Sequence, residues 1–262
     1  MFQKWKQNLR YSWINLWWAL RLRLWHLSAW QFAYLYALSF LRPDLYEKSV
    51  HSDTDVVIEG FPRSANTFLV HAFEMAVSGK LKVAHHFHDP CQIGLAIRSQ
   101  IPCFVIIRNP LDAIVSWKLK APNIDVRLML RIYDSFYRYA FEKEQVIFLR
   151  YSDVVGYTPK IVRAILQHSE QNLQADLASL TEERIFHSID NHKRAREGKH
   201  SGNFDLTVAR PTKEKEDLKR TLRSDISTQE KVLLSEVSLF YKNILSRCLD
   251  LEQDIGVAKE KV

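Results

Sequence analysis

The chain has 262 residues, of which 47% are hydrophobic, 12% aromatic and only seven glycine, which is typical of a globular protein and excludes a disordered or collagen-like chain. The three cysteines are scattered, which disfavours a disulfide framework or a cysteine-built zinc site and fits a reducing, cytoplasmic compartment. Lys and Arg outnumber Asp and Glu by 37 to 30, so the surface should attract an anion: nucleic acid, acidic lipid or a phosphorylated ligand.

Residues 1–50 form an aromatic and basic arm that precedes a domain over residues 51–262. Six of the seven tryptophans and five Lys or Arg residues lie within the first thirty positions, and an uncharged run over 24–41 follows. This run is close to the shortest helix that can cross a bilayer, and its aromatic residues suit the headgroup region better. We expect residues 1–42 either to pack as a helical hairpin on the domain or to lie peripherally on the cytoplasmic face of a membrane; a membrane span is the third alternative.

Apolar strands alternate with helices from Asp55 onward. The expected strands cover 56–58, 81–84, 103–107 and 146–149, and helices are expected over 67–77 and 90–99 and from Asp112 and Pro159. Continuous apolar strands of this kind predict an α/β fold, with a parallel β-sheet flanked by helices in a P-loop-like three-layer arrangement. Ligands bind such sheets at the carboxyl ends of the strands, where polar residues follow each run.

The segment 60–67, between the first strand and its helix, has a spacing close to the phosphate loop G-x-x-x-x-G-K-[ST], with Ala-Asn in place of Gly-Lys. Backbone N–H groups at the helix start and the hydroxyls of Ser64 and Thr67 would form an anion cradle, and Arg63 would supply the cation. Arg108, not an aspartate that could hold Mg²⁺, ends the third strand. The alternative is an ordinary turn with a capping Ser or Asn.

A second basic element, 108–116, follows the third strand. Arg108 at the strand end and Ser116 in the next helix can point at one small anion. In the alternative interpretation, Asp112 caps this helix and pairs with Arg108. Two phosphate-type elements at neighbouring strand ends suit a nucleotide that carries phosphates at both its 3′ and 5′ positions.

Together these motifs resemble those of the sulfotransferases that use 3′-phosphoadenosine 5′-phosphosulfate (PAPS). Residues 62–68 are similar to the family's loop P-[KR]-S-G-[TN]-T-[WF], with Ala65 at the glycine, and 108–116 match its element R-[ND]-P-x-D-x-x-x-S in full. The resemblance covers roughly residues 55–160 and implies PAPS as co-substrate, without a metal. It also implies that Phe68 stacks on adenine, and that the nucleotide is bound by Arg63, Ser64, Ala65, Asn66, Thr67, Phe68, Arg108, Ser116 and Tyr151.

Three histidines end the second strand, in the sequence HHFH over 85–88. The family's strand end K-T-H-x-P carries its catalytic base, and the resemblance assigns that role to His88 and the lysine position to His86. His85 or His86 could instead be the base, and a buried structural role is the favoured interpretation of His85. A histidine base would accept the proton of a hydroxyl or amine acceptor during in-line sulfuryl transfer, while Arg63 and His86 stabilise the leaving phosphate.

The last third contains few motifs. A basic stretch over 192–203 resembles the family's loop R-K-G-x-x-G, which would add Arg196 and Gly198 to the nucleotide site; the alternative is a solvated loop. Segments 117–130 and 186–210 are expected to be loops that line the acceptor pocket, and 226–251 to be one amphipathic helix. The acceptor would be a small molecule, a carbohydrate or a lipid-linked compound, and nucleic acid is not favoured. The alternatives are a P-loop kinase and a non-catalytic, membrane-associated nucleotide-binding protein.

Overall fold

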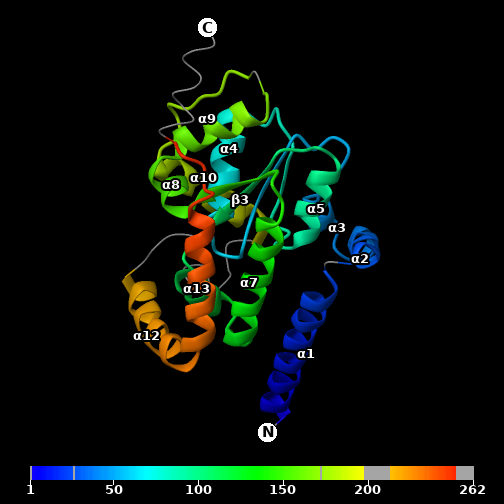
Figure 1. Cartoon of the computed structure of the whole chain (residues 1–262), viewed down its shortest axis with the longest axis vertical. Helices are drawn as coiled ribbons and strands as arrows, with labels where there is room; N and C mark the ends of the chain where they lie inside the picture. The colour runs from blue at the N-terminus through cyan, green and yellow to red at the C-terminus, as the bar shows by residue number, and fades with distance from the viewer. Residues whose placement is uncertain (1, 26, 172, 198–212, 252–262) are drawn as a thin grey trace.

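The computed structural model describes residues 2–25, 27–171, 173–197 and 213–251 (Figure 1). Its four-stranded parallel sheet has the order β2-β1-β3-β4. The strands are β1 (Val56–Gly60), β2 (Val83–His85), β3 (Cys103–Ile107) and β4 (Val146–Arg150). All four predicted strands are confirmed to within two residues, because each is an apolar run long enough to fix its own position.

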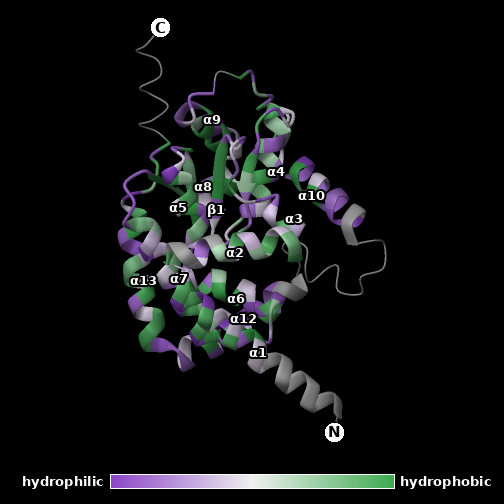
Figure 2. Ribbon diagram, turned by 90° about the vertical axis from the view of Figure 1, so that its right-hand side faces the viewer, coloured by the Kyte–Doolittle hydropathy of each residue, from purple (hydrophilic) through white to green (hydrophobic). Residues whose placement is uncertain are grey.

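Both faces of the sheet are covered, which confirms the predicted three-layer α/β fold. Along β1, Val57 contributes to one hydrophobic cluster and Ile58 to the other, as expected for side chains that alternate across a strand. Figure 2 shows apolar residues in the sheet and in the helices against it, whereas α10 is largely polar. The Ile58 face is covered by α4 (Asn66–Val77), α8 (Tyr151–Gly156), α9 (Thr158–His168) and α10 (Glu182–Glu197). The Val57 face is covered by α5 (Pro90–Arg98), α6 (Pro110–Lys120), α7 (Val126–Phe141), α12 (Lys213–Gln229) and α13 (Lys231–Leu245).

Three expectations for the helices and loops are wrong. The expected loop over 117–130 is largely helical, since α6 continues to Lys120 and α7 begins at Val126. Likewise, α10 occupies the start of the expected loop over 186–210, and residues 198–210 lie outside the described part. The single helix expected over 226–251 is divided at Glu230 between α12 and α13. Periodicity alone did not reveal these boundaries.

The arm packs against the domain through the second half of its first helix and the residue that follows it. It consists of α1 (Phe2–Leu24), α2 (Ser28–Leu41) and the short α3 (Pro43–Tyr46), with α1 beside α7 in Figure 1. Trp25 is only 2% exposed within the Val57-side cluster, and the ring of Trp18 meets that of Trp117 edge-on at 5.4 Å. No helix among the described residues has the length and apolarity needed to cross a membrane.

The order of the strands reverses between β1 and β3. Helix α4, which follows β1, lies on one face of the sheet, and α6, which follows β3, lies on the other, so the loops that follow β1 and β3 diverge. In sheets of this kind, the crevice at such a switch point is where ligands bind. Gly60 pairs with Ile106 in the register, which places the loop after β1 beside Arg108.

Candidate active site

The loop after β1 starts at a glycine that the structure requires. A Cβ atom at Gly60 would lie 2.7 Å from Asn66 Oδ1 and 2.7 Å from the carbonyl oxygen of Ile106. The Asn66 side chain donates from Nδ2 to the carbonyl oxygens of Gly60 and Phe61, at 3.2 and 3.1 Å. A side chain at position 60 would therefore displace both β3 and the Asn66 amide that closes the loop.

The amino end of α4 has no side-chain cap. Its N-cap residue is Ala65, which adopts the left-handed conformation (φ 69°, ψ 17°) and makes no capping hydrogen bond. The alternative of a Ser or Asn cap on α4 is therefore wrong. The first N–H groups of a helix lack partners within the helix and carry partial positive charge, so an uncapped start suits an anion.

Two arginines meet above the switch point. Arg108 donates from Nη1 to the carbonyl oxygen of Arg63 at 2.7 Å, and its guanidinium lies over the ring of Tyr151 at 4.2 Å. Arg63 donates from Nε to Ser116 Oγ at 3.1 Å. The structure thus brings together Arg63, Arg108, Ser116 and Tyr151, which come from the segments that follow three different strands. Asp112 pairs with Arg223 at 2.8 Å, so the alternative pairing of Arg108 with Asp112 is wrong.

Among the described acidic residues, Glu216 of α12 has its pKa lowered by a hydrogen bond with Lys219 and also by the nearby Arg108 charge, but it forms no salt bridge with Arg108. Neither Arg63 nor Arg108 forms a salt bridge with an acidic residue in the described part of the chain. Burial, together with the nearby Arg108 charge, lowers the pKa of Arg63. Arg108 Nε is buried and has no hydrogen-bond partner among the described residues. Two adjacent cations with an unused donor fit a ligand that carries more than one negative charge.

The other residues predicted to contact the nucleotide differ in how deeply they are buried. The Ser64 side chain is fully buried beneath the loop, and Thr67 Oγ1 lies 2.8 Å from His86 Nε2. Phe68 is buried in the cluster on the Ile58 side, with its ring 5.5 Å from that of Phe186 in α10. The contact of Ser64 with an anion and the stacking of Phe68 on adenine stay predictions.

His88 is held in one orientation. Its Nδ1 lies 2.7 Å from the carbonyl oxygen of Gly60, which can only accept, so Nδ1 carries the hydrogen. Burial lowers the pKa of His88 to about 4, although the bond to Gly60 opposes this shift. The ring is therefore neutral at pH 7, and the unprotonated Nε2 has no hydrogen-bond partner among the described residues. Such a nitrogen can accept a proton.

His86 and His85 are engaged with each other. His86 Nδ1 contacts His85 Nδ1, and His86 Nε2 contacts Thr67 Oγ1 at 2.8 Å, so both ring nitrogens of His86 have partners. Burial lowers the pKa of His86 well below its usual value and that of His85 to about 3. His86 therefore has no free ring nitrogen, whereas Nε2 of His88 and Nε2 of His85 have no hydrogen-bond partner among the described residues.

Sequence reasoning missed two ionisable side chains that contact the loop of His88. Glu59, fully buried in β1, accepts from the backbone N–H groups of Phe87 and His88, at 2.6 and 3.1 Å. Arg21 of α1 reaches the same loop and pairs with Asp89 at 2.7 Å. An acidic residue at the end of the apolar run of β1 was a signal for Glu59. The sequence contained no signal for the role of Arg21, because Arg21 lies 68 residues before its partner Asp89.

The late basic segment is described only in part. Arg196 belongs to the last turn of α10 and its side chain lies outside the described part, as does Gly198. Within the described residues, no group of three or more His, Cys, Asp and Glu side chains is arranged to hold a metal ion. The contribution of Arg196 and Gly198 to nucleotide binding stays a prediction.

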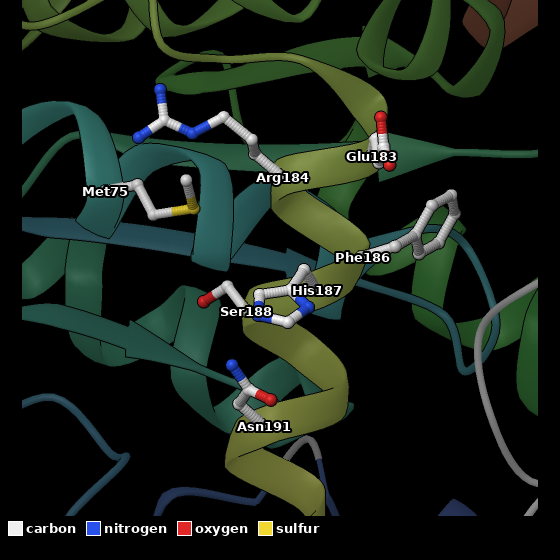
Figure 3. Close-up of a pocket in the computed structure, with 7 residues that line it drawn as sticks. All are labelled: Met75, Glu183, Arg184, Phe186, His187, Ser188 and Asn191. Carbon is white, nitrogen blue, oxygen red and sulfur yellow. The ribbon is translucent and has the colours of Figure 1, made fainter.

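Two adjoining hollows lie on the α4 side of the sheet, and neither includes the two arginines of the candidate site. One, of about 590 Å³, lies between Met75 of α4 and one side of α10 (Figure 3). The other, of about 850 Å³, follows the edge of β2 and is lined by His71, His85 and several charged residues. They share Met75 and Ser188, and neither is lined by Arg63 or Arg108. His85 therefore connects the histidine cluster with the larger hollow.

Comparisons with known proteins find only remote similarity. No family model and no curated protein matches the sequence. Among solved structures, the chain is similar to the crystal structure of mouse sulfotransferase SULT7A1 complexed with PAP, with 12% sequence identity and a TM-score of 0.39, over 75% of this chain and 93% of that chain. The interpretation of the site therefore depends on its own geometry and motifs.

Proposed function

We propose that this chain is a PAPS-dependent sulfotransferase that moves a sulfuryl group to a hydroxyl or amine acceptor. The observation that supports the proposal is the contact between Arg63 and Arg108 at the carboxyl ends of β1 and β3, without an acidic partner among the described residues. A nucleoside with phosphates at both its 3′ and 5′ positions presents two separate anions to two such cations. The paired motifs at residues 62–68 and 108–116 favour this ligand over a nucleoside triphosphate.

Each arginine has its own phosphate in this proposal. Arg108, with its buried Nε and its stacking on Tyr151, binds the 3′-phosphate together with Ser116. Arg63 and the uncapped N–H groups at the start of α4 bind the phosphate on the 5′ side. Bound PAPS supplies the sulfuryl group and the phosphate that leaves.

His88 is the proposed base. As the bond forms between the acceptor oxygen and sulfur, the acceptor proton passes to His88 Nε2. The bond between sulfur and the bridging oxygen breaks, and its electron pair leaves with the 5′-phosphate. Arg63 stabilises the charge that develops on this leaving group. His86 is not assigned as the base, because both of its ring nitrogens are engaged.

The arm is proposed to lie on an anionic membrane surface, which would favour a lipid-linked or amphipathic acceptor. Trp13, Leu16, Trp17 and Leu20 recur at helical spacing on α1, and Trp13 is 69% exposed. No acidic residue precedes Asp44, whereas six Lys or Arg residues do. Exposed aromatic side chains and a net positive charge together suit the headgroup region of an acidic bilayer.

The first experiment is calorimetric titration with adenosine 3′,5′-bisphosphate and with adenosine 5′-monophosphate. We expect the bisphosphate to bind more tightly, and Arg108→Ala to weaken it by about 10–150-fold, the equivalent of losing a charged hydrogen bond of roughly 1.5–3 kcal/mol. The monophosphate should lose little affinity. Arg131→Ala, the same change at an exposed position of α7, should leave both affinities unchanged.

Two results would reject the proposal. Equal losses for both nucleotides in Arg108→Ala would show that Arg108 does not bind the 3′-phosphate. Tighter binding of ATP with Mg²⁺ than of adenosine 3′,5′-bisphosphate would favour a P-loop kinase. The non-catalytic alternative predicts nucleotide binding without sulfuryl transfer to any acceptor.

A further inference from the structure

The loop that carries His88 is held from two sides by buried ionisable side chains: Glu59, whose pKa burial raises to about 8, and Arg21, which is ion-paired. From β1, Glu59 accepts hydrogen bonds from the N–H groups of Phe87 and His88. From the arm, Arg21 donates from Nη2 to the carbonyl oxygen of Phe87 at 3.1 Å and from Nε to Asp89 Oδ2 at 2.7 Å. The peptide group before His88 and the side chain of Asp89 after it are thus tied to elements that are distant in the sequence.

The contact made by Arg21 is fully inside the protein. The side chains of Arg21 and Asp89 are 7% and 1% exposed, and the guanidinium lies 4.8 Å from the ring of Trp18 and 5.1 Å from that of Tyr34. Asp89 also accepts from the N–H of Cys91, which caps α5. Burial opposes the charge of Arg21, yet the Asp89 carboxylate keeps the pKa of Arg21 raised. A buried pair persists when further hydrogen bonds satisfy both partners, as here.

The backbone of His88 needs such support. Its φ of 52° lies in the left-handed region, which non-glycine residues occupy only where the surroundings hold them. The direction of Nε2 depends on this backbone conformation and on the bond from Nδ1 to Gly60. Freeing one side of the loop would therefore let the ring turn away from the acceptor.

We propose that Arg21 is a positioning residue for His88, so that the N-terminal arm forms part of the active centre. The inference rests on the proposed function for its kinetic consequence, but the placement of the His88 ring can be measured without catalysis. Arg21 acts on the loop through Phe87 and Asp89.

The test is the double variant Arg21→Met/Asp89→Asn. It removes both contacts of Arg21 without leaving a buried carboxylate unpaired, and asparagine keeps the cap on α5. We expect kcat for sulfuryl transfer to fall by about 100-fold, the loss typical of a catalytic group displaced by about 1 Å, with the Kd for adenosine 3′,5′-bisphosphate unchanged. Arg23→Met, the same change at an exposed position of α1, is the control and should keep the wild-type kcat.

The second measurement is the tautomer of His88, from the ¹⁵N chemical shifts of its imidazole at pH 7. The wild-type protein and Arg23→Met should contain the single Nδ1–H form, and the double variant a mixture of both forms. If the double variant fails to fold by circular dichroism, Arg21→Lys, which keeps a charge beside Asp89 but loses the planar fork, serves in its place. A folded variant with wild-type kcat and a single tautomer would overturn the proposal. A wild-type protein without transferase activity would reject the proposed function, while the tautomer measurement would still decide the role of Arg21.

Discussion

Ala65→Gly should stabilise the protein slightly, although alanine-to-glycine changes inside helices destabilise. Ala65 adopts the left-handed conformation at the start of α4, which costs a residue with a side chain roughly 1–2 kcal/mol. Glycine removes this cost but gains about 0.4–1 kcal/mol of conformational entropy in the unfolded state. The half-buried methyl group of Ala65 contributes about 0.4 kcal/mol, half of the value for a fully buried methylene. The net gain is about 0.5 kcal/mol.

The matched control is Ala72→Gly in the same helix. Ala72 is fully buried in the middle of α4. Glycine there loses about 1 kcal/mol of helix propensity and roughly 0.8 kcal/mol of methyl burial. The two identical substitutions should therefore differ by about 2 kcal/mol and have opposite signs.

Thermal denaturation followed by circular dichroism measures both changes. The melting temperature should rise by about 1–2 °C for Ala65→Gly and fall by several degrees for Ala72→Gly. Equal destabilisation by both substitutions would falsify the left-handed conformation at position 65. The interpretation of the loop as a phosphate loop with alanine at its glycine position would then lose its structural basis.

Three further predictions concern the histidines and the arm. His88→Ala should reduce kcat by about 10²–10⁴-fold with nucleotide affinity retained, and His86→Ala should reduce it less; the reverse order, measured with any accepted substrate, would reassign the base. Stability to urea should fall as the pH drops from about 6.5 toward 4, because burial lowers the folded-state pKa of His71 and His88 to about 4, so that the unfolded chain takes up protons first. Each of these histidines contributes up to about 1.4 kcal/mol per pH unit, and a flat profile between pH 7 and 5 would contradict their burial. Leu16→Ser should weaken sedimentation with phosphatidylserine vesicles, whereas Leu239→Ser, at a still more exposed position of α13, should not; equal binding of both variants would argue against membrane binding by the arm.

The sheet could be predicted because each of its strands is a continuous apolar run in the sequence. The β3 run over 103–107 coincides with its prediction, since five consecutive apolar residues between a proline and an arginine leave no other position for a buried strand. The proximity of Arg63 and Arg108 followed from the same reasoning, because the carboxyl ends of parallel strands share one edge. What the sequence could not show is how these arginines are oriented, which depends on Ser116 and Tyr151 from two further elements.

The role of Arg21 could not be predicted for a different reason. A basic residue among tryptophans is equally compatible with a membrane surface and with a buried ion pair, and the choice depends on Asp89, a residue in another element. The same holds for His88. The motif identifies His88 only by its distance from a proline. That its Nε2 is the free nitrogen depends on Gly60, whose carbonyl oxygen accepts the hydrogen bond from Nδ1.

The distribution of left-handed residues links the strain in this chain to its candidate site. Seven non-glycine residues of the described part have positive φ. Three of them, Ser78, Gln100 and Glu170, follow the ends of α4, α5 and α9, where helices commonly terminate in this conformation. The other four are Arg63, Ala65, His86 and His88, all in the loops after β1 and β2.

Conformations of this kind cost about 1–3 kcal/mol each and persist only where surrounding contacts fix them. Here the contacts are identifiable: Asn66 closes the first loop, and Glu59 and Arg21 hold the second. If the strain served only to turn the chain, glycine would do so at lower cost, as it does at Gly79. Arginine and histidine at such positions instead indicate that their side chains are needed where the strained backbone directs them. Relieving the strain at His88 with glycine should therefore preserve the fold and abolish the activity.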